Sequence, residues 1–215
     1  GSEVNMTWDS PGIYLLYTYH YSFFGCDTLE QGLVKVFEAP AAFAGNDQVA
    51  CAEDNIFLGN STAEDYSTLF WTTFGDGFFN DPNILRPTYF PGENDIATGN
   101  VSLSLTAMGL GSPGTCGPAV SVVNVTFSKP EIVLTADIPL CFGESTGTVS
   151  ASVSGGFGSY IYAWTGPEGF TASTSEISNL VSGWYYLSVT DSLGCMAEDS
   201  IEVTQPEELI AVIDS

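Results

Sequence analysis

The sequence predicts an all-β protein built from β-sandwich modules in tandem, and three observations favour this fold class. Short apolar runs alternate with polar residues, which is typical of strands with one buried face. Clusters of Gly, Pro, Asn and Asp separate these runs and indicate turns. A phrase, Gly-x-Tyr followed by Gly-Cys, occurs at residues 12–26 and again at residues 183–195, and such repetition indicates a modular array.

The alternation places strands along most of the chain. The clearest period-two runs are residues 101–107, 149–153, 160–164, 185–189 and 201–203. No apolar stripe of helical spacing extends beyond a turn or two. Sandwich modules are the natural way to bury such one-sided strands, so we expect them to follow one another as an extended array.

Composition supports packed cores and excludes several classes of partner. Apolar residues make up 44% of the 215 residues, which is ample for folded domains. Three basic residues against 26 acidic ones give a formal net charge of −23, which repels nucleic acid and anionic lipid surfaces. No apolar run approaches the roughly 18 to 20 residues that cross a bilayer, so we expect no direct membrane insertion.

A second internal repeat predicts the module boundaries. Residues 128–136 resemble residues 204–212, and each copy supplies a proline that ends one strand before another begins. A weaker boundary follows Glu38. We therefore expect four parts: the closing strands of a truncated immunoglobulin-like module whose beginning precedes residue 1 (1–39), two complete modules (40–129 and 130–205), and the first strand of the next repeat (206–215).

The five cysteines favour disulfides over a metal site. They are widely spaced, form no CxxC pair, and share the chain with a single histidine, His20, which does not suit zinc. Disulfides of an oxidising compartment are one interpretation, and buried free thiols are the other. Keeping each bond inside a module pairs Cys51 with Cys116 and Cys141 with Cys195. Cys26 then remains unpaired.

Residues 140–195 resemble a known repeat family. Leu140-Cys141-Phe142-Gly143-Glu144, Gly155-Gly156-Phe157-Gly158, Tyr162-Ala163-Trp164-Thr165-Gly166-Pro167 and Gly194-Cys195 are similar to the SprB repeat. That repeat occurs in very long surface adhesins of gliding Bacteroidetes exported by the type IX secretion system. The resemblance implies an extracellular module at the cell surface.

The middle module resembles a PKD-like immunoglobulin domain. Trp71-Thr72-Thr73-Phe74-Gly75-Asp76-Gly77 is similar to the W-x-F-G-D-G motif of that family, and Pro87-Thr88-Tyr89-Phe90-Pro91-Gly92 to its Y-x-P-G turn. Residues 93–100 are an insertion relative to the family. Trp71 and Trp164 occupy the positions of immunoglobulin-like core tryptophans, so we expect both to be buried.

Both resemblances imply a non-catalytic stalk segment of a secreted surface adhesin, which supports adhesion and gliding by extending and presenting the adhesive. Its expected partners are neighbouring modules of the same chain and, through the parent protein, surface polysaccharide or other cell-surface components. With His20 alone no catalytic triad can be assembled, so we expect no enzyme. The alternatives are a carbohydrate-binding module and a structural subunit of an extracellular fibre.

Calcium is the most credible small ligand. Oxygen-rich loops could supply hard ligands from five residues: Asp76, Asp81, Glu93, Asp95 and Glu131. A site at the boundary near residues 129–131 would stiffen the joint between two modules. None of these loops follows the spacing of a dedicated calcium loop, and solvated turn acids are the competing interpretation.

Two kinds of surface site complete the expectations. Trp184 and Tyr185 are consecutive in an alternating strand, so one of them is exposed, and Trp184 is a candidate glycan contact. Three tripeptides resemble the D-[S/T]-aliphatic acceptor of Bacteroidetes O-glycosylation, at Thr28, Ser192 and Ser200. A hairpin turn before Gly194 explains the second tripeptide equally well.

Overall fold

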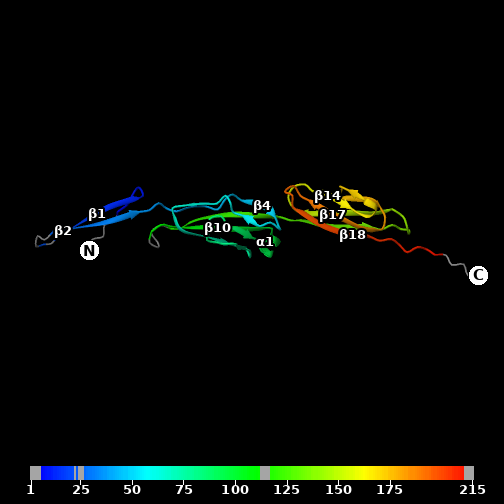
Figure 1. Cartoon of the computed structure of the whole chain (residues 1–215), viewed down its shortest axis with the longest axis horizontal. Coiled ribbons are helices and arrows are strands. Elements are labelled where there is room, and N and C mark those ends of the chain that lie inside the picture. Colours follow the sequence, from blue (N-terminus) through cyan, green and yellow to red (C-terminus); the bar gives the residue numbers. More distant parts are fainter. Residues whose placement is uncertain (1–5, 22, 24–26, 112–116, 211–215) are drawn as a thin grey trace, which may run out of the picture. The chain divides into compact units, whose positions relative to one another are not determined.

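The computed structural model confirms the all-β prediction. It describes residues 6–21, 23, 27–111 and 117–210, which form two compact units (Figure 1). The first unit contains the residues up to Asp47, Asn55–Gly92 and Val101–Asn124, and the second contains Gln48–Asp54, Glu93–Asn100 and the residues from Val125 onward. The described part of the chain has one short helix, α1 (Glu93–Thr98), and a single 3-10 turn at Pro167–Gly169. No described helix has the length and apolarity to span a membrane.

The first unit begins with an antiparallel hairpin. Strand β1 (Gly12–Tyr21) pairs with β2 (Asp27–Val36) in a two-stranded sheet. The indole of Trp8 lies 4.3 Å from the ring of Tyr14, so the segment before β1 covers part of one face of this hairpin.

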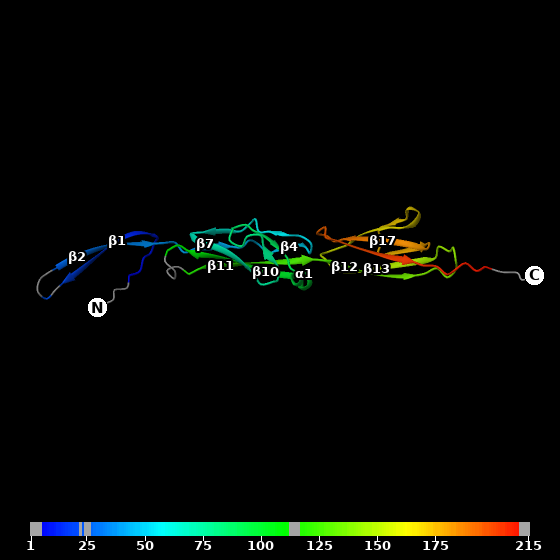
Figure 2. The same cartoon turned by 60° about the horizontal axis from the view of Figure 1, so that its bottom comes forward.

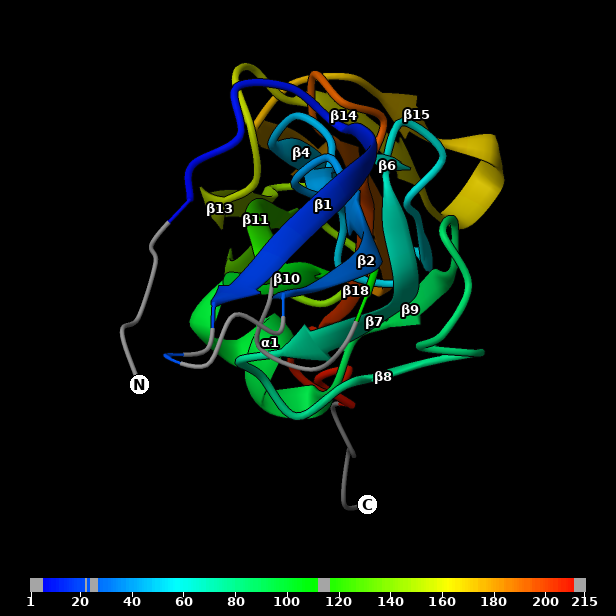
Figure 3. The ribbon, with the colours of Figure 1, turned by 90° about the vertical axis from the view of Figure 1, so that its left-hand side faces the viewer.

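The rest of the first unit holds short strands around an apolar core. Its strands are β3 (Ala41–Phe43), β5 (Ile56–Phe57), β6 (Thr62–Glu64), β7 (Tyr66–Thr73), β8 (Phe78–Phe79), β9 (Thr88–Phe90), β10 (Asn100–Gly109) and β11 (Ala119–Ser128), the last two extending into the second unit. Strands β7, β10 and β11 are neighbours in one sheet, and β8 runs beside β9 in another (Figure 3). Trp71 and Tyr89 are buried, so the prediction for Trp71 is confirmed.

The second unit is a sandwich of two sheets. Its strands are β12 (Pro130–Asp137), β13 (Gly147–Gly155), β14 (Ile161–Thr165), β15 (Thr171–Ala172), β16 (Glu176–Leu180), β17 (Gly183–Thr190) and β18 (Met196–Val203). Strand β4 (Gln48–Cys51) also lies in this unit but pairs with the end of β11. One sheet has the order β12–β13–β16 and the other β15–β14–β17–β18, and Figure 2 shows β12 and β13 in a different layer from β17. Trp164 lies in the core between them, as predicted, with 1% of its surface exposed.

The predicted strand runs and the proline between two of them are confirmed. Four of the five period-two runs lie entirely within strands, in β10, β13, β17 and β18, and the fifth, residues 160–164, begins one residue before β14. Strand β11 ends at Ser128 and β12 begins at Pro130. Residues 206–210 contain no strand, and residues 211–215 lie outside the described part of the chain. The expected module boundaries stay predictions.

The repeated phrase folds twice as the same hairpin. Gly12 pairs with Val36 at the start of β1, and Gly183 pairs with Val203 at the start of β17. The Tyr14 hydroxyl donates to the carbonyl of Ser10 at 2.7 Å, and the Tyr185 hydroxyl donates to the carbonyl of Val181 at 3.0 Å. In both hairpins the tyrosine therefore ties the strand to the backbone four residues upstream, as the tyrosine corner of an immunoglobulin sandwich does.

Candidate functional site

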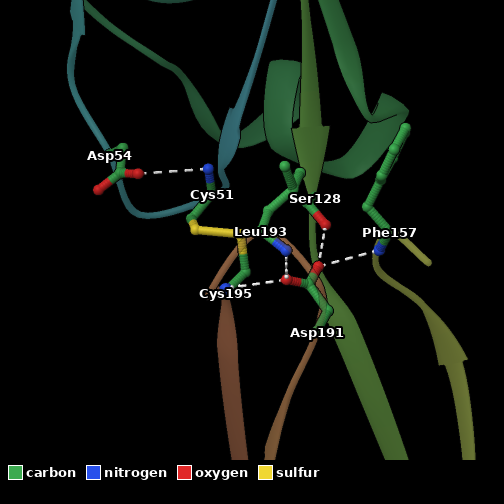
Figure 4. Close-up of a disulfide and its surroundings, with 7 residues drawn as sticks. All are labelled: Cys51, Asp54, Ser128, Phe157, Asp191, Leu193 and Cys195. Atoms are coloured by element: carbon green, nitrogen blue, oxygen red, sulfur yellow. Dashed lines mark hydrogen bonds between the residues drawn. A yellow bond between two sulfur atoms is a disulfide. The ribbon is translucent and has the colours of Figure 1, made fainter. Parts of the chain in front are cut away.

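A disulfide joins distant parts of the second unit. Cys51 ends β4 and Cys195 directly precedes β18 (Figure 4). Their Cα atoms are 5.3 Å apart, and 144 residues of sequence separate them. The bond therefore links a residue before the predicted boundary at 129/130 to a residue after it.

The predicted cysteine pairs are wrong. Cys51 is not bonded to Cys116, and Cys195 is not bonded to Cys141, which is an exposed free thiol. The physical reason is the parallel pairing of β4 with the end of β11, from Gln48 beside Val125 to Cys51 beside Ser128. This register brings Cys51 to the end of β11, where the turn after β17 presents Cys195. Cys26 and Cys116 lie outside the described residues, so the unpaired state expected for Cys26 stays a prediction.

Next to the disulfide lies the buried carboxylate of Asp191. We call this carboxylate and the groups that donate hydrogen bonds to it the Asp191 network. Asp191 is 3% exposed. One of its oxygens accepts hydrogen bonds from the Ser128 hydroxyl and, at 2.9 Å, from the Phe157 amide. The other accepts from the Leu193 and Cys195 amides, both at 2.9 Å (Figure 4). The network thus joins the end of β11, the loop after β13 and the β17–β18 turn.

The Asp191 network holds its central carboxyl in the charged form. Burial acts to raise the pKa of Asp191, but the four hydrogen bonds outweigh it, with that from Ser128 foremost. The pKa of Asp191 therefore lies below its ordinary value. A buried charge satisfied by four donors is a structural anchor, because losing it would leave buried donors unpaired.

Local sequence explains how these segments approach one another. The Gly194 amide donates to the Asp191 carbonyl at 3.1 Å, which closes the turn that was predicted before Gly194. Gly155 has a φ of +67°, and a Cβ at this position would collide with the Lys129 carbonyl oxygen. Only glycine allows so close an approach. The sequence signalled the turn, but nothing in it showed that Asp191 is buried.

The disulfide borders a recess of about 610 Å³ within the second unit. Cys51 and Cys195 both line this recess, together with Glu53, Lys129 and Glu198. Cys51 is partly exposed at this recess, whereas Cys195 is buried.

The structure does not assemble the predicted calcium ligands. The described residues contain no group of three or more His, Cys, Asp or Glu side chains able to hold a metal ion. Glu131 lies 3.9 Å from the ammonium of Lys129, and Asp81 accepts hydrogen bonds from Asn83 as a turn acid does. Asp95 is buried in α1, which begins at Glu93, and the exposed Asp76 lies against Gly92. Calcium binding therefore stays a prediction without an assembled site.

The predicted surface residues differ in their exposure and in their contacts. Thr28 and Ser200 are exposed on strands β2 and β18. The Ser192 hydroxyl accepts from the Ser159 amide at 2.9 Å and donates to the Ser159 carbonyl at 3.2 Å, so its oxygen is already engaged. Trp184 is 48% exposed and Tyr185 is 1% exposed, which confirms that one of these neighbours faces outward.

Comparison with protein families supports the resemblance drawn from the sequence. Residues 139–169 match the model of the SprB repeat family. The matching segment spans β13, β14 and the 3-10 turn of the second unit. No curated protein matches the chain.

Solved structures show an immunoglobulin-like fold. The N-terminal eight Ig domains of Down Syndrome Cell Adhesion Molecule align with a TM-score of 0.52 and 10% identity over 91% of this chain. This chain spans 37% of the length of that structure. DIP-gamma IG1+IG2 aligns with a TM-score of 0.42 and 11% identity, covering 80% of this chain and 99% of that one. The amphioxus IgVJ-C2 molecule aligns with a TM-score of 0.31 and 13% identity, covering 73% of this chain and 99% of that one. At these identities the first likeness describes the fold alone.

Proposed function

We propose that this chain is a load-bearing, non-catalytic segment of a surface adhesin, supporting adhesion and gliding by extending and presenting the adhesive. The observation that carries the proposal is the Cys51–Cys195 disulfide with the Asp191 network beside it. The SprB repeat match, the immunoglobulin-like fold and a disulfide typical of oxidising compartments support a location at the cell surface.

The disulfide sets the path of a pulling force. When tension is applied to backbone before Cys51 and after Cys195, the covalent bond transmits it, and the residues between the two cysteines cannot be drawn out. A separation of 144 residues corresponds to roughly 500 Å of extended chain that stays folded until the bond is reduced. A segment that keeps its length under load is suited to a stalk.

The same bond also stabilises the fold without load. Closing a loop of this length removes entropy from the unfolded chain and contributes about 5 kcal/mol in the chain-entropy model. The acidic surface, with a net charge of −23, opposes lateral aggregation of neighbouring stalks.

Adhesion under flow tests the proposal. Replacing Cys51 and Cys195 by serine in the surface protein that contains this segment removes the covalent path, whereas Cys141→Ser is the matched control because this thiol is free. We expect equal surface display of both variants and detachment at lower shear only for the double variant. Unchanged adhesion strength in the double variant would contradict the proposal.

A further inference from the structure

The outer face of the β14–β17–β18 sheet contains a groove that the core of the second unit does not use. Its volume is about 570 Å³, within the range of small-molecule sites. Strand register sets its lining in two rows across the three strands: Thr165, Tyr186 and Ser200 in one row, and Ala163, Ser188 and Glu198 in the next. We call this surface the outer groove.

Two aromatic side chains stand along the outer groove on one strand. Tyr186 lines it and is 55% exposed, and Trp184 is two residues before it on the same face of β17, at 48% exposed. The spacing of two strand residues separates them by about 7 Å. The core of this unit already has its own aromatic pair in Trp164 and Tyr185, each 1% exposed. Packing therefore does not account for the outer pair.

The polar groups of the outer groove match the chemistry of a sugar. The C–H face of a sugar ring packs on aromatic rings, and its hydroxyls both donate and accept hydrogen bonds. Glu198 offers a carboxylate to accept from hydroxyls, and Ser188, Ser200 and Thr165 offer hydroxyls that can do either. The small side chain of Ala163, at the β14 end of the second row, leaves the groove open there.

Charge selects the class of sugar. Glu198 and Asp199 line the outer groove, Glu202 pairs with Trp184, and the whole chain has a net charge of −23. This field repels uronic acids, sulfated glycans and other anionic polymers. From these observations we infer that the outer groove binds a short neutral oligosaccharide, with Tyr186 and Trp184 as the stacking surfaces and Glu198 as the hydroxyl acceptor.

Aromatic rings beside carboxylates can also attract quaternary ammonium groups. Such cations are usually held by rings that enclose them, whereas Trp184 and Tyr186 follow one another along a single strand. A row of rings suits the flat faces of successive sugar units better. Choline is therefore included as a competing probe in the experiment that follows.

An NMR titration of the whole chain tests the inference. The probes are neutral, uronic-acid and amino oligosaccharides and choline, each at millimolar concentration. We expect neutral oligosaccharides to shift the amides of β14, β17 and β18. Tyr186→Ala and Trp184→Ala should each weaken binding about tenfold, the effect of one lost aromatic contact. Glu198→Gln should weaken it less, because an amide still accepts through one oxygen.

Control variants separate a loss of binding at the outer groove from a general loss of stability. Phe142→Ala removes an aromatic of similar exposure, 50%, outside the outer groove and should leave the affinity unchanged. All four substitutions replace exposed side chains, so we expect unchanged melting temperatures. Each of four results would overturn the inference: no response to neutral oligosaccharides, shifts confined to other strands, aromatic variants that bind as tightly as the wild type, or a response to choline alone. None of these results would affect the load-bearing role, which depends on the disulfide.

Discussion

The hairpins β1–β2 and β17–β18 share their local structure but differ in what covers them. Each begins at a glycine paired with a valine, and each ties its tyrosine hydroxyl to the carbonyl four residues upstream. Tyr185 and Leu187 lie in the core of the second unit, whereas Tyr14 and Leu16 are only half-buried. The comparison indicates that the repeated phrase determines the strand register of a hairpin. Whether the side chains of that hairpin are buried depends on a second sheet that covers them.

The largest contrast should appear when equivalent leucines are truncated. Leu187→Ala leaves a cavity in a packed core, so we expect a loss of about 2–5 kcal/mol in the free energy of unfolding of the second unit. Leu16→Ala removes a half-buried side chain and should cost about 1 kcal/mol or less. Hydrogen exchange resolved by segment measures both changes. Equal losses in the two hairpins would show that β1–β2 is as well covered as β17–β18.

The Asp191 network should make the second unit sensitive to acid. The pKa of Asp191 is lower in the folded state than in the unfolded chain, so its contribution is complete above about pH 4 and is lost as the pH falls through the folded-state value. Asp191→Asn should cost about 2 kcal/mol at neutral pH, because the amide keeps only one acceptor oxygen and two of the four donors lose theirs. It should also flatten the melting temperature between about pH 4 and pH 2. Asp199→Asn, an exposed acid of the same hairpin, is the control.

An acid profile of the Asp191→Asn variant that matches the wild type would assign the acid sensitivity to other carboxyls. A variant as stable as the wild type at neutral pH would show that water or neighbouring groups replace the lost acceptor. Both results would remove the Asp191 network from the account.

The two starting glycines should respond differently to a methyl group. Gly183 has a φ of +147°, and a Cβ there would lie 2.5 Å from Cγ of Pro167. Gly183→Ala should therefore cost about 1–3 kcal/mol. Gly12 has a similar φ of +159°, but its Cβ would lie 3.4 Å from the Tyr14 ring, so Gly12→Ala lacks the collision and should cost less. A larger loss at Gly12, measured by urea denaturation, would contradict this order.

The smallest contrast concerns the two tyrosine hydroxyls. Tyr185→Phe removes a partly buried hydrogen bond and should cost about 1 kcal/mol. The bond of Tyr14 is exposed, so water replaces it and Tyr14→Phe should cost a few tenths of a kcal/mol. Burial also raises the pKa of Tyr185. Thermal melts of the two variants compare the costs, and equal shifts would mean that the corner bond is equally protected in both hairpins.

The distinction between local pattern and long-range packing also explains which features could be predicted from the sequence alone. Period-two alternation is a local signal, and it correctly predicted the strands, whereas the core positions of Trp71 and Trp164 were predicted from the immunoglobulin-like resemblance. The disulfide depends on β4 pairing in parallel with the end of β11, a long-range contact that no local pattern encodes. Asp191 reads as a turn residue in the sequence, and only the approach of Ser128 and Phe157 makes it a buried anchor.

Force spectroscopy of the single chain tests the central claim most directly. Without reductant, pulling on the two ends should extend only the residues outside the disulfide-closed loop. Adding reductant should then release roughly 500 Å of further contour length for the 144-residue separation between Cys51 and Cys195. The Cys141→Ser variant should behave in the same way. Full extension in the absence of reductant would contradict the account.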